Sequence, residues 1–197
     1  YHAKNASEAL EDTDTVSVLE TSSGYMYDGP GQDTALIFYP GAKVEDIAYA
    51  PLLKQLAASG VDCFLVKMPG NLAIFGKDRA QNVLDEFGDD YKNWYLAGHS
   101  LGGAMAAEYA SDHAEQLRGL IFLAAYSTKD LSDTDLKVLS LYGSEDQVLN
   151  RDKVVQGRTL MPPAYAEHEI EGGNHAQFGN YGKQKGDGVA AITADQQ

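Results

Sequence analysis

The residues best suited to chemistry lie between positions 93 and 110, where a short apolar segment leads through a turn of small residues into an Ala-rich helical segment. The turn reads Gly98-His99-Ser100-Leu101-Gly102, which matches the Gly-x-Ser-x-Gly pattern of a nucleophile elbow. An elbow exposes the serine hydroxyl beside the free N–H groups and positive dipole end of a helix. The pattern predicts a serine that attacks an acyl carbon. The alternative is a glycine-rich turn whose serine only caps the helix.

A serine nucleophile needs a histidine base, and three histidines follow Ser100 in the chain. His113 lies at the end of the helix predicted after the elbow, and His168 lies inside a predicted strand. His175 follows that strand, in a glycine-containing loop. Because loops at the ends of strands often carry catalytic groups, position favours His175 as the base.

The base in turn needs a carboxylate that holds its ring. The apolar segment 136–142 leads into Gly143-Ser144-Glu145-Asp146-Gln147-Val148, which places Asp146 in a tight turn after a strand. The chain order serine, acid, histidine is the one that accompanies this kind of elbow. We expect Asp146 to accept the Nδ1 proton of His175, so that Nε2 is free to take the serine proton. Glu145 is the alternative acid, and Asp146 is otherwise a turn residue bonded to its own backbone.

Two backbone N–H groups are needed to bind the negative oxygen that forms when serine attacks a carbonyl. Leu101, directly after the serine, supplies one of them. The second is expected from the loop Pro40-Gly41-Ala42-Lys43, which follows an early buried strand. We predict Ala42 as this donor, with Lys43 as the alternative. Without such a role, Pro-Gly is an ordinary turn.

Apolar strands alternate with amphipathic helices through most of the chain, a pattern typical of an α/β fold. We expect a mostly parallel sheet with helices on both faces and no cap domain, and ligands at the carboxyl ends of its strands. Residues 1–14 are expected to form a leader segment before a single domain that spans residues 15–197. The predicted strands are 16–20, 25–27, 34–39, 61–68, 94–97, 117–125, 136–142 and 165–170; the predicted helices, besides the one after the elbow, are 48–59, 77–87, 148–160 and 189–193.

The composition excludes several classes of function. The 197 residues include 15 Lys+Arg and 29 Asp+Glu, and the resulting net charge of −14 argues against nucleic acid or an anionic membrane as a partner. No apolar run approaches the length of a membrane span. The single cysteine, Cys63, lies in a largely apolar segment, so an internal disulfide and a cysteine-built metal site are both excluded.

Taken together, these residues make the chain resemble the α/β-hydrolase superfamily over essentially its whole length. More narrowly it resembles the small, lid-less bacterial group called alpha/beta hydrolase family 5, which is related to dienelactone-hydrolase-type enzymes. The resemblance implies Ser100, Asp146 and His175 as a catalytic triad, Ala42 and Leu101 as oxyanion donors, and no metal or cofactor. It is carried by residues 35–45, 98–106, 141–146 and 171–179.

Two residues depart from the patterns of these relatives. Proline stands at position 40, where many of them have histidine, so a side-chain contribution there is lost. The nucleophile is serine where dienelactone hydrolases have cysteine, which argues against their substrate. Relatives often carry one membrane-spanning segment before the domain. The resemblance therefore implies an extracytoplasmic setting with an N-terminal anchor ahead of Tyr1, and a cytoplasmic one otherwise.

We expect a carboxylesterase that forms an acyl-enzyme on Ser100 and takes a small-molecule ester as its partner, without nucleic acid or membrane contact by this domain. The connection between the predicted strands 117–125 and 136–142 is of ordinary length, so the site is open and suits small or exposed acyl groups. The alternatives are a peptidase, thioesterase or transacylase on the same fold, or a binding module without catalysis.

Overall fold

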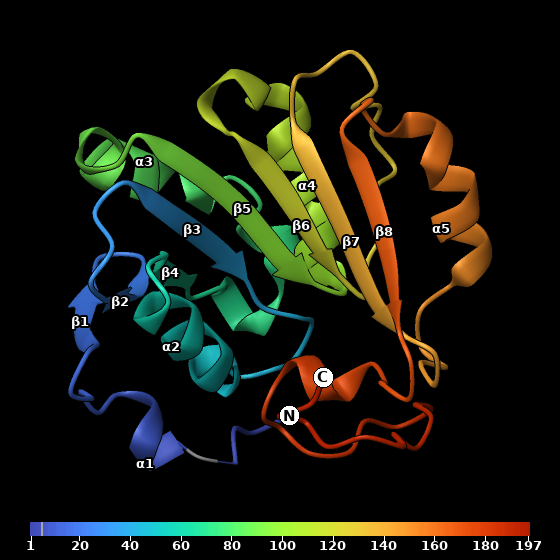
Figure 1. Ribbon diagram of the computed structural model, residues 1–197, viewed down its shortest axis with the longest axis horizontal. Helices are drawn as coiled ribbons and strands as arrows, with labels where there is room; N and C mark the ends of the chain where they lie inside the picture. Colours follow the sequence, from blue (N-terminus) through green and yellow to red (C-terminus); the bar gives the residue numbers. More distant parts are fainter. Residues whose placement is uncertain (5) are drawn as a thin grey trace.

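Eight strands form one sheet in the order β1-β2-β4-β3-β5-β6-β7-β8, in a computed structural model that describes residues 1–4 and 6–197 (Figure 1). The strands from β4 to β8 in this order are parallel, whereas β2 pairs antiparallel with β4 and β1 with β2. This confirms the predicted fold class. The strands are β1 Ser17–Thr21, β2 Gly24–Asp28, β3 Thr34–Tyr39, β4 Asp62–Val66, β5 Asn93–His99, β6 Gly119–Leu123, β7 Lys137–Gly143 and β8 Tyr165–Ile170.

Helices cover both faces of the sheet. Figure 1 shows α2 in front of β3 and β4, while α3 and α4 lie behind the sheet. The α-helices are α1 Ala6–Ala9, α2 Ala50–Ala58, α3 Arg79–Phe87, α4 Leu101–Asp112 and α5 Arg151–Gly157. Short 3₁₀ turns connect them: η1 Asp46–Tyr49, η2 Pro69–Asn71, η3 Ala73–Phe75, η4 Gly88–Asp90, η5 Ala114–Gln116, η6 Arg158–Leu160 and η7 Ala176–Phe178.

The central strands are apolar along their whole length because both of their faces are buried. In β3, Ile37 and Tyr39 face the core formed with α3 and α4, whereas Leu36 and Phe38 face the core formed with α2. This alternation follows from the two-residue period of a strand. The two cores hold the carboxyl ends of the strands in place, and the loops that leave those ends carry the residues of the site.

Several predicted elements are shorter than expected. The helix predicted at 48–59 divides into the 3₁₀ turn η1 and α2, and the one at 148–160 begins only at α5, where the Asn150 side chain caps it by accepting the Lys153 N–H. The helix predicted at 189–193 is wrong. The Ala191 N–H instead bonds the Gly172 carbonyl, which holds the tail in an irregular conformation beside the end of β8.

The first residues pack against two loops far away in the sequence. The Ala3 N–H donates to the Glu45 carboxylate at 2.7 Å, the Lys4 N–H donates to the Asn180 carbonyl at 2.9 Å, and the Tyr1 ring lies 5.3 Å from that of Tyr181. The helix in this segment spans only Ala6–Ala9. The division into residues 1–14 and 15–197 stays a prediction.

The connection from β6 to β7 leaves the carboxyl end of the sheet and returns to the opposite end, where the parallel strand β7 begins. It comprises residues 124–136, and no cap domain is inserted there. Among the described residues, no helix has both the length and the apolar character to cross a bilayer.

Candidate active site

Ser100 lies in a strained turn between β5 and α4. Its backbone angles are φ 54° and ψ −123°, in a region that residues with a side chain rarely occupy. The strain is maintained by close packing, because a Cβ atom on Gly102 would lie 2.3 Å from the carbonyl oxygens of both Tyr39 and Pro40. The chain therefore reverses sharply at the serine, and α4 begins at the next residue. This is the geometry expected of a nucleophile elbow.

His175 and Asp146 form a buried pair. The Nδ1 atom of His175 lies 2.8 Å from Oδ2 of Asp146, and the two residues are 1% and 4% exposed. The other oxygen of Asp146 accepts the N–H groups of Val148 and Leu149, both at 2.8 Å. Burial acts to raise the pKa of Asp146, but the bonds from His175 and these two N–H groups outweigh it and lower that pKa. The carboxylate is thus held charged against the ring.

The second ring nitrogen of His175 is unbonded. Nε2 is buried and, within residues 1–4 and 6–197, has no hydrogen-bond partner, so it forms no bond with the hydroxyl of Ser100 in this structure. Hydrogen bonds between catalytic groups are often long without substrate and tighten when it binds. Both residues line one cavity of about 240 Å³, whose walls are Ser100, Leu101, Ala104, Ala124, Ala125, Tyr126, Val148, Leu149, Asn150 and His175.

The loop after β3 distinguishes the two candidate oxyanion donors. The Lys43 N–H donates to the Asn71 carbonyl at 2.7 Å, with Lys43 itself at a φ of 59°. The Gly41 N–H donates to the Tyr49 hydroxyl at 3.0 Å. Ala42 stands between them, and among the described residues its N–H and that of Leu101 donate to no protein acceptor. These two N–H groups are therefore available for a ligand.

The other sequence candidates lie apart from this pair. Glu145 neighbours Asp146 in the chain, but its carboxylate accepts from the hydroxyl of Ser144 and does not contact the His175 ring. His113 directly follows α4 and stacks on the ring of Tyr109, with the ring centroids 4.4 Å apart. His168 is exposed on β8. The structure brings together Asp146 and His175 and leaves these three elsewhere.

Comparison with known proteins places the chain in a family. The family model described as "Alpha/beta hydrolase family" matches residues 35–197. The chain belongs to this family. The match begins within β3 and includes the elbow, the Asp146 turn and the His175 loop, which are the parts that form the site.

Solved structures of other α/β-hydrolases share the fold of this family member. A predicted CIB-like hydrolase from Thermoplasma acidophilum has a TM-score of 0.68 and 13% identity, over 84% of this chain and 92% of that one. Est1E from Butyrivibrio proteoclasticus has a TM-score of 0.62 and 15% identity, over 82% and 90%. An alpha/beta hydrolase enzyme from the metagenome of lagoon sediments at Mar Chica, Morocco, has a TM-score of 0.64 and 15% identity, over 87% of this chain and 91% of that one. No curated protein sequence matches this chain.

Sequence reasoning missed three residues that contact the His175 loop of this α/β-hydrolase. Asp187 accepts the Ala176 N–H at 2.9 Å and the His175 N–H at 3.3 Å. His99 bonds the His175 carbonyl, and Tyr49 bonds His99. A signal for Asp187 was its place between two glycines, Gly186 and Gly188, in the segment that follows His175 in the chain. Tyr49 had none, because only the fold brings it there.

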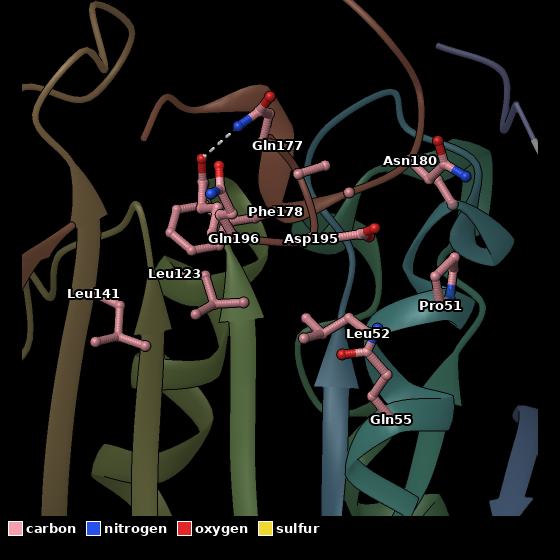
Figure 2. A pocket seen from close by; sticks show the side chains of 14 residues that line it. Pro51, Leu52, Gln55, Leu123, Leu141, Gln177, Phe178, Asn180, Asp195 and Gln196 are labelled. Carbon is pink, nitrogen blue, oxygen red and sulfur yellow. Dashed lines mark hydrogen bonds between the residues drawn. The ribbon is translucent and has the colours of Figure 1, made fainter. Parts of the chain in front are cut away.

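A second, larger cavity lies on the α2 face of the sheet. It measures about 460 Å³ and is enclosed by α2, the ends of β6 and β7, and the last residues of the chain. Figure 2 shows Leu123 and Leu141 on its sheet side and Gln177 and Phe178 reaching it from the loop after His175. Ser100, Asp146 and His175 are not among its walls. The two cavities are therefore distinct, and only the smaller one adjoins the elbow.

Proposed function

We propose that this α/β-hydrolase is a serine carboxylesterase. The observation that carries the proposal is the buried Asp146–His175 pair, whose unpartnered Nε2 belongs to a ring lining the same cavity as Ser100. A histidine oriented by a carboxylate, beside a serine in a strained elbow, is the arrangement that activates a hydroxyl for attack on an acyl carbon.

In the first half of the proposed reaction, the Ser100 hydroxyl attacks the ester carbonyl carbon while Nε2 of His175 takes its proton. Asp146 keeps the Nδ1 proton on the ring and stabilises the imidazolium that forms. The new C–O bond leaves a negative charge on the former carbonyl oxygen. When the tetrahedral intermediate collapses, Nε2 returns the proton to the leaving alcohol, and the acyl group stays on Ser100.

In the second half, water attacks the acyl-enzyme and gives its proton to Nε2 of His175, after which Ser100 leaves and is reprotonated. The negative oxygen of both intermediates binds to the N–H groups of Leu101 and Ala42. We assign the second donor to Ala42 because the N–H of Lys43 is already bonded to Asn71. The N-terminus of α4, which begins at Leu101, adds its dipole at the same place.

The shape of the site favours small acyl groups. Its cavity of about 240 Å³ is smaller than most ligand pockets, and no cap domain extends it. Apolar side chains such as Leu101, Val148 and Leu149 line the walls, so a short aliphatic acyl chain fits better than a charged one. The alcohol group of the ester then points toward the open side of the cavity.

A fluorophosphonate probe and short-chain nitrophenyl esters test the proposal. The wild type should be labelled and should hydrolyse the esters, whereas Ser100→Ala should not be labelled and should lose roughly 10⁶-fold in kcat. Ser111→Ala is the matched control, because Ser111 is also on α4 but bonds only its own helix, at the Glu108 carbonyl. An unlabelled, inactive wild type would indicate a binding module without catalysis.

The same assay separates esters from other acyl substrates. Butyrate presented as a nitrophenyl ester, a thioester and a peptide amide should be cleaved with the highest kcat/KM for the ester. A higher kcat/KM for the thioester or the amide would contradict the carboxylesterase assignment while retaining Ser100 as the nucleophile.

A further inference from the structure

A hydrogen-bonded chain of buried groups passes behind the site. The Tyr49 hydroxyl lies 3.0 Å from the Gly41 nitrogen and 2.7 Å from Nδ1 of His99, and Nε2 of His99 lies 3.0 Å from the His175 carbonyl oxygen. Tyr49 and His99 are 0% and 1% exposed. We call these four groups the Tyr49–His99 relay. Its members come from the loop after β3, from η1, from the end of β5 and from the loop after β8.

The direction of every hydrogen bond in the relay follows from its partners. A peptide carbonyl only accepts, so Nε2 of His99 must carry a proton. Burial, and secondly the neighbouring His175, lower the pKa of His99 to about 3, so its ring is neutral and Nδ1 is an acceptor. Tyr49 therefore donates its proton to Nδ1, and its oxygen accepts the N–H of Gly41. All four groups are satisfied at once, which fixes one tautomer of His99.

The relay connects the three segments from which the site is built. Gly41 directly precedes the oxyanion donor Ala42, His99 directly precedes Ser100, and the carbonyl of His175 belongs to the base itself. The contact at Gly41 is tightly packed, because a Cβ on Gly41 would lie 2.9 Å from the Tyr49 hydroxyl and 3.0 Å from Nδ1 of His99. Because these hydrogen bonds join the three segments, we expect a displacement of one segment to displace the other two.

We propose that Tyr49 and His99 are positioning residues, which hold the Ala42 loop and His175 at a fixed separation across Ser100. This rests on the proposed function, since Ala42, Ser100 and His175 act on the same acyl group only if that function is correct. A displacement of such groups by about 1 Å can lower the rate of a catalysed step by roughly 100-fold. Loss of the relay lowers the rate of the chemical step and leaves substrate binding nearly unchanged.

The variant Tyr49→Phe tests the proposal, because it removes the hydroxyl and keeps the ring. We expect kcat per titrated serine to fall roughly 10- to 100-fold with KM changed less than about threefold. Tyr27→Phe is the matched control, since Tyr27 is equally buried but its hydroxyl contacts only the Ala9 carbonyl, at 3.4 Å. It should leave kcat within about twofold of wild type. Equal kcat values for the two variants would overturn the proposal.

A double substitution tests whether the two residues act together. His99→Gln keeps an N–H donor for the His175 carbonyl but removes the ring Nδ1 that accepts the Tyr49 hydroxyl. If both residues belong to one relay, Tyr49→Phe combined with His99→Gln should lose little more kcat than the worse single variant. Losses that multiply would show that Tyr49 and His99 act independently, which contradicts the relay.

Nitrogen-15 NMR of the imidazole rings reports the tautomer and charge of His99 without any catalytic turnover. Wild-type His99 should show the neutral tautomer with the proton on Nε2 across the range where the protein is folded. A proton on Nδ1, or a charged ring, would overturn the relay even if the fluorophosphonate still labels Ser100. Conversely, the expected tautomer in a wild type that neither labels nor hydrolyses esters refutes the proposed function, and the positioning role with it.

Discussion

The proposed nucleophile and the proposed base of this site are held in different ways. Ser100 is placed by its backbone. Its conformation is fixed by the positive φ, by the start of α4 and by the close packing of Gly102 against two carbonyl groups. His175 is placed by hydrogen bonds from other segments. Asp146 holds its ring at 2.8 Å, His99 holds its carbonyl at 3.0 Å, and Asp187 accepts its N–H at 3.3 Å.

This difference has an energetic consequence. Packing of main chain against main chain cannot relax by turning a side chain. A substitution that crowds the elbow should therefore lower the free energy of unfolding. The bonds at His175 come from separate segments, and each can be removed by a nearly isosteric substitution. We therefore expect substitutions around the base to change activity at little change in stability, and substitutions at the elbow backbone to change both.

Among substitutions around His175, the largest effect on kcat is expected for Asp146→Asn. The amide keeps the shape of the side chain but favours the wrong tautomer of His175, and kcat should fall by roughly 10⁴-fold by analogy with other triads. The measurement is kcat for a nitrophenyl ester, with circular dichroism to establish that the variant is folded.

Glu145→Gln is the control for this substitution. Because the Glu145 carboxylate does not contact His175, kcat should stay within about threefold of wild type. If Asp146→Asn were nearly as active as wild type and Glu145→Gln were inactive, the acid would be Glu145 and the pair observed here would be a structural contact.

On the nucleophile side, Gly102→Ala should act through the fold. The new Cβ would lie 2.3 Å from the carbonyl oxygens of Tyr39 and Pro40, and we expect a loss of roughly 1–3 kcal/mol in the free energy of unfolding. Urea denaturation measures this loss. The control is Gly88→Ala, where a Cβ meets nothing within 4 Å and φ is −53°, so stability should be unchanged or slightly higher. Equal stabilities would show that the elbow has room to relax.

The same difference explains what could be predicted from the sequence. The elbow leaves a local pattern, since its glycines must flank Ser100 within five residues, and the predicted strand and helix around it are present as β5 and α4. Strand β3 was predicted with the bounds it has, because buried strands are short apolar runs ended by turn residues. The half-exposed edge strand β8 was also predicted with its observed bounds. Local rules of this kind require no knowledge of the rest of the chain.

The contacts of His175 could not be predicted in this way. Tyr49 is 50 residues from His99 along the chain, and His99 is 76 residues from His175. A buried tyrosine in an amphipathic segment has the same pattern whether its hydroxyl bonds groups of the candidate site, as Tyr49 does, or a distant carbonyl, as Tyr27 does. The helix predicted at 189–193 was wrong for a related reason: its residues have helical spacing, but the Gly172 carbonyl holds Ala191 instead.

A smaller effect is expected for Asp187→Asn. The amide can accept only one of the two N–H groups of His175 and Ala176, so the base loop should become less well fixed. We expect the displaced base loop to lower kcat roughly 10-fold, and the lost hydrogen bond to lower the melting temperature by about a few degrees. Asp195→Asn, an exposed residue of the same tail, is the control and should match wild type. A fall in melting temperature without a fall in kcat would mean that Asp187 only anchors the tail.

The smallest effect concerns stability against pH and involves His99. Its ring is faced by Tyr49 from η1, by His175 and Phe178 from the loop after β8, by Tyr181 from the tail, and at longer range by the Asp146 carboxylate. Burial, followed by the nearby His175, lowers the pKa of His99 to about 3 in the folded chain. Unfolded histidine has a pKa of about 6.5, so below that pH the unfolded chain takes up a proton that the folded chain refuses.

Stability should therefore fall as the pH drops from about 6.5 toward 3, by at most about 1.4 kcal/mol per pH unit from this group. The window from about pH 6.5 to 4.5 isolates the effect from Asp146, whose lowered pKa costs stability only below the carboxyl range near 3.9. Urea midpoints at both ends of the window, for wild type, His99→Gln and the exposed-site control His168→Gln, measure it. His99→Gln should reduce the dependence on pH and His168→Gln should retain it, because only a histidine that stays neutral inside the fold opposes protonation; equal slopes in all three would mean that water reaches the His99 ring.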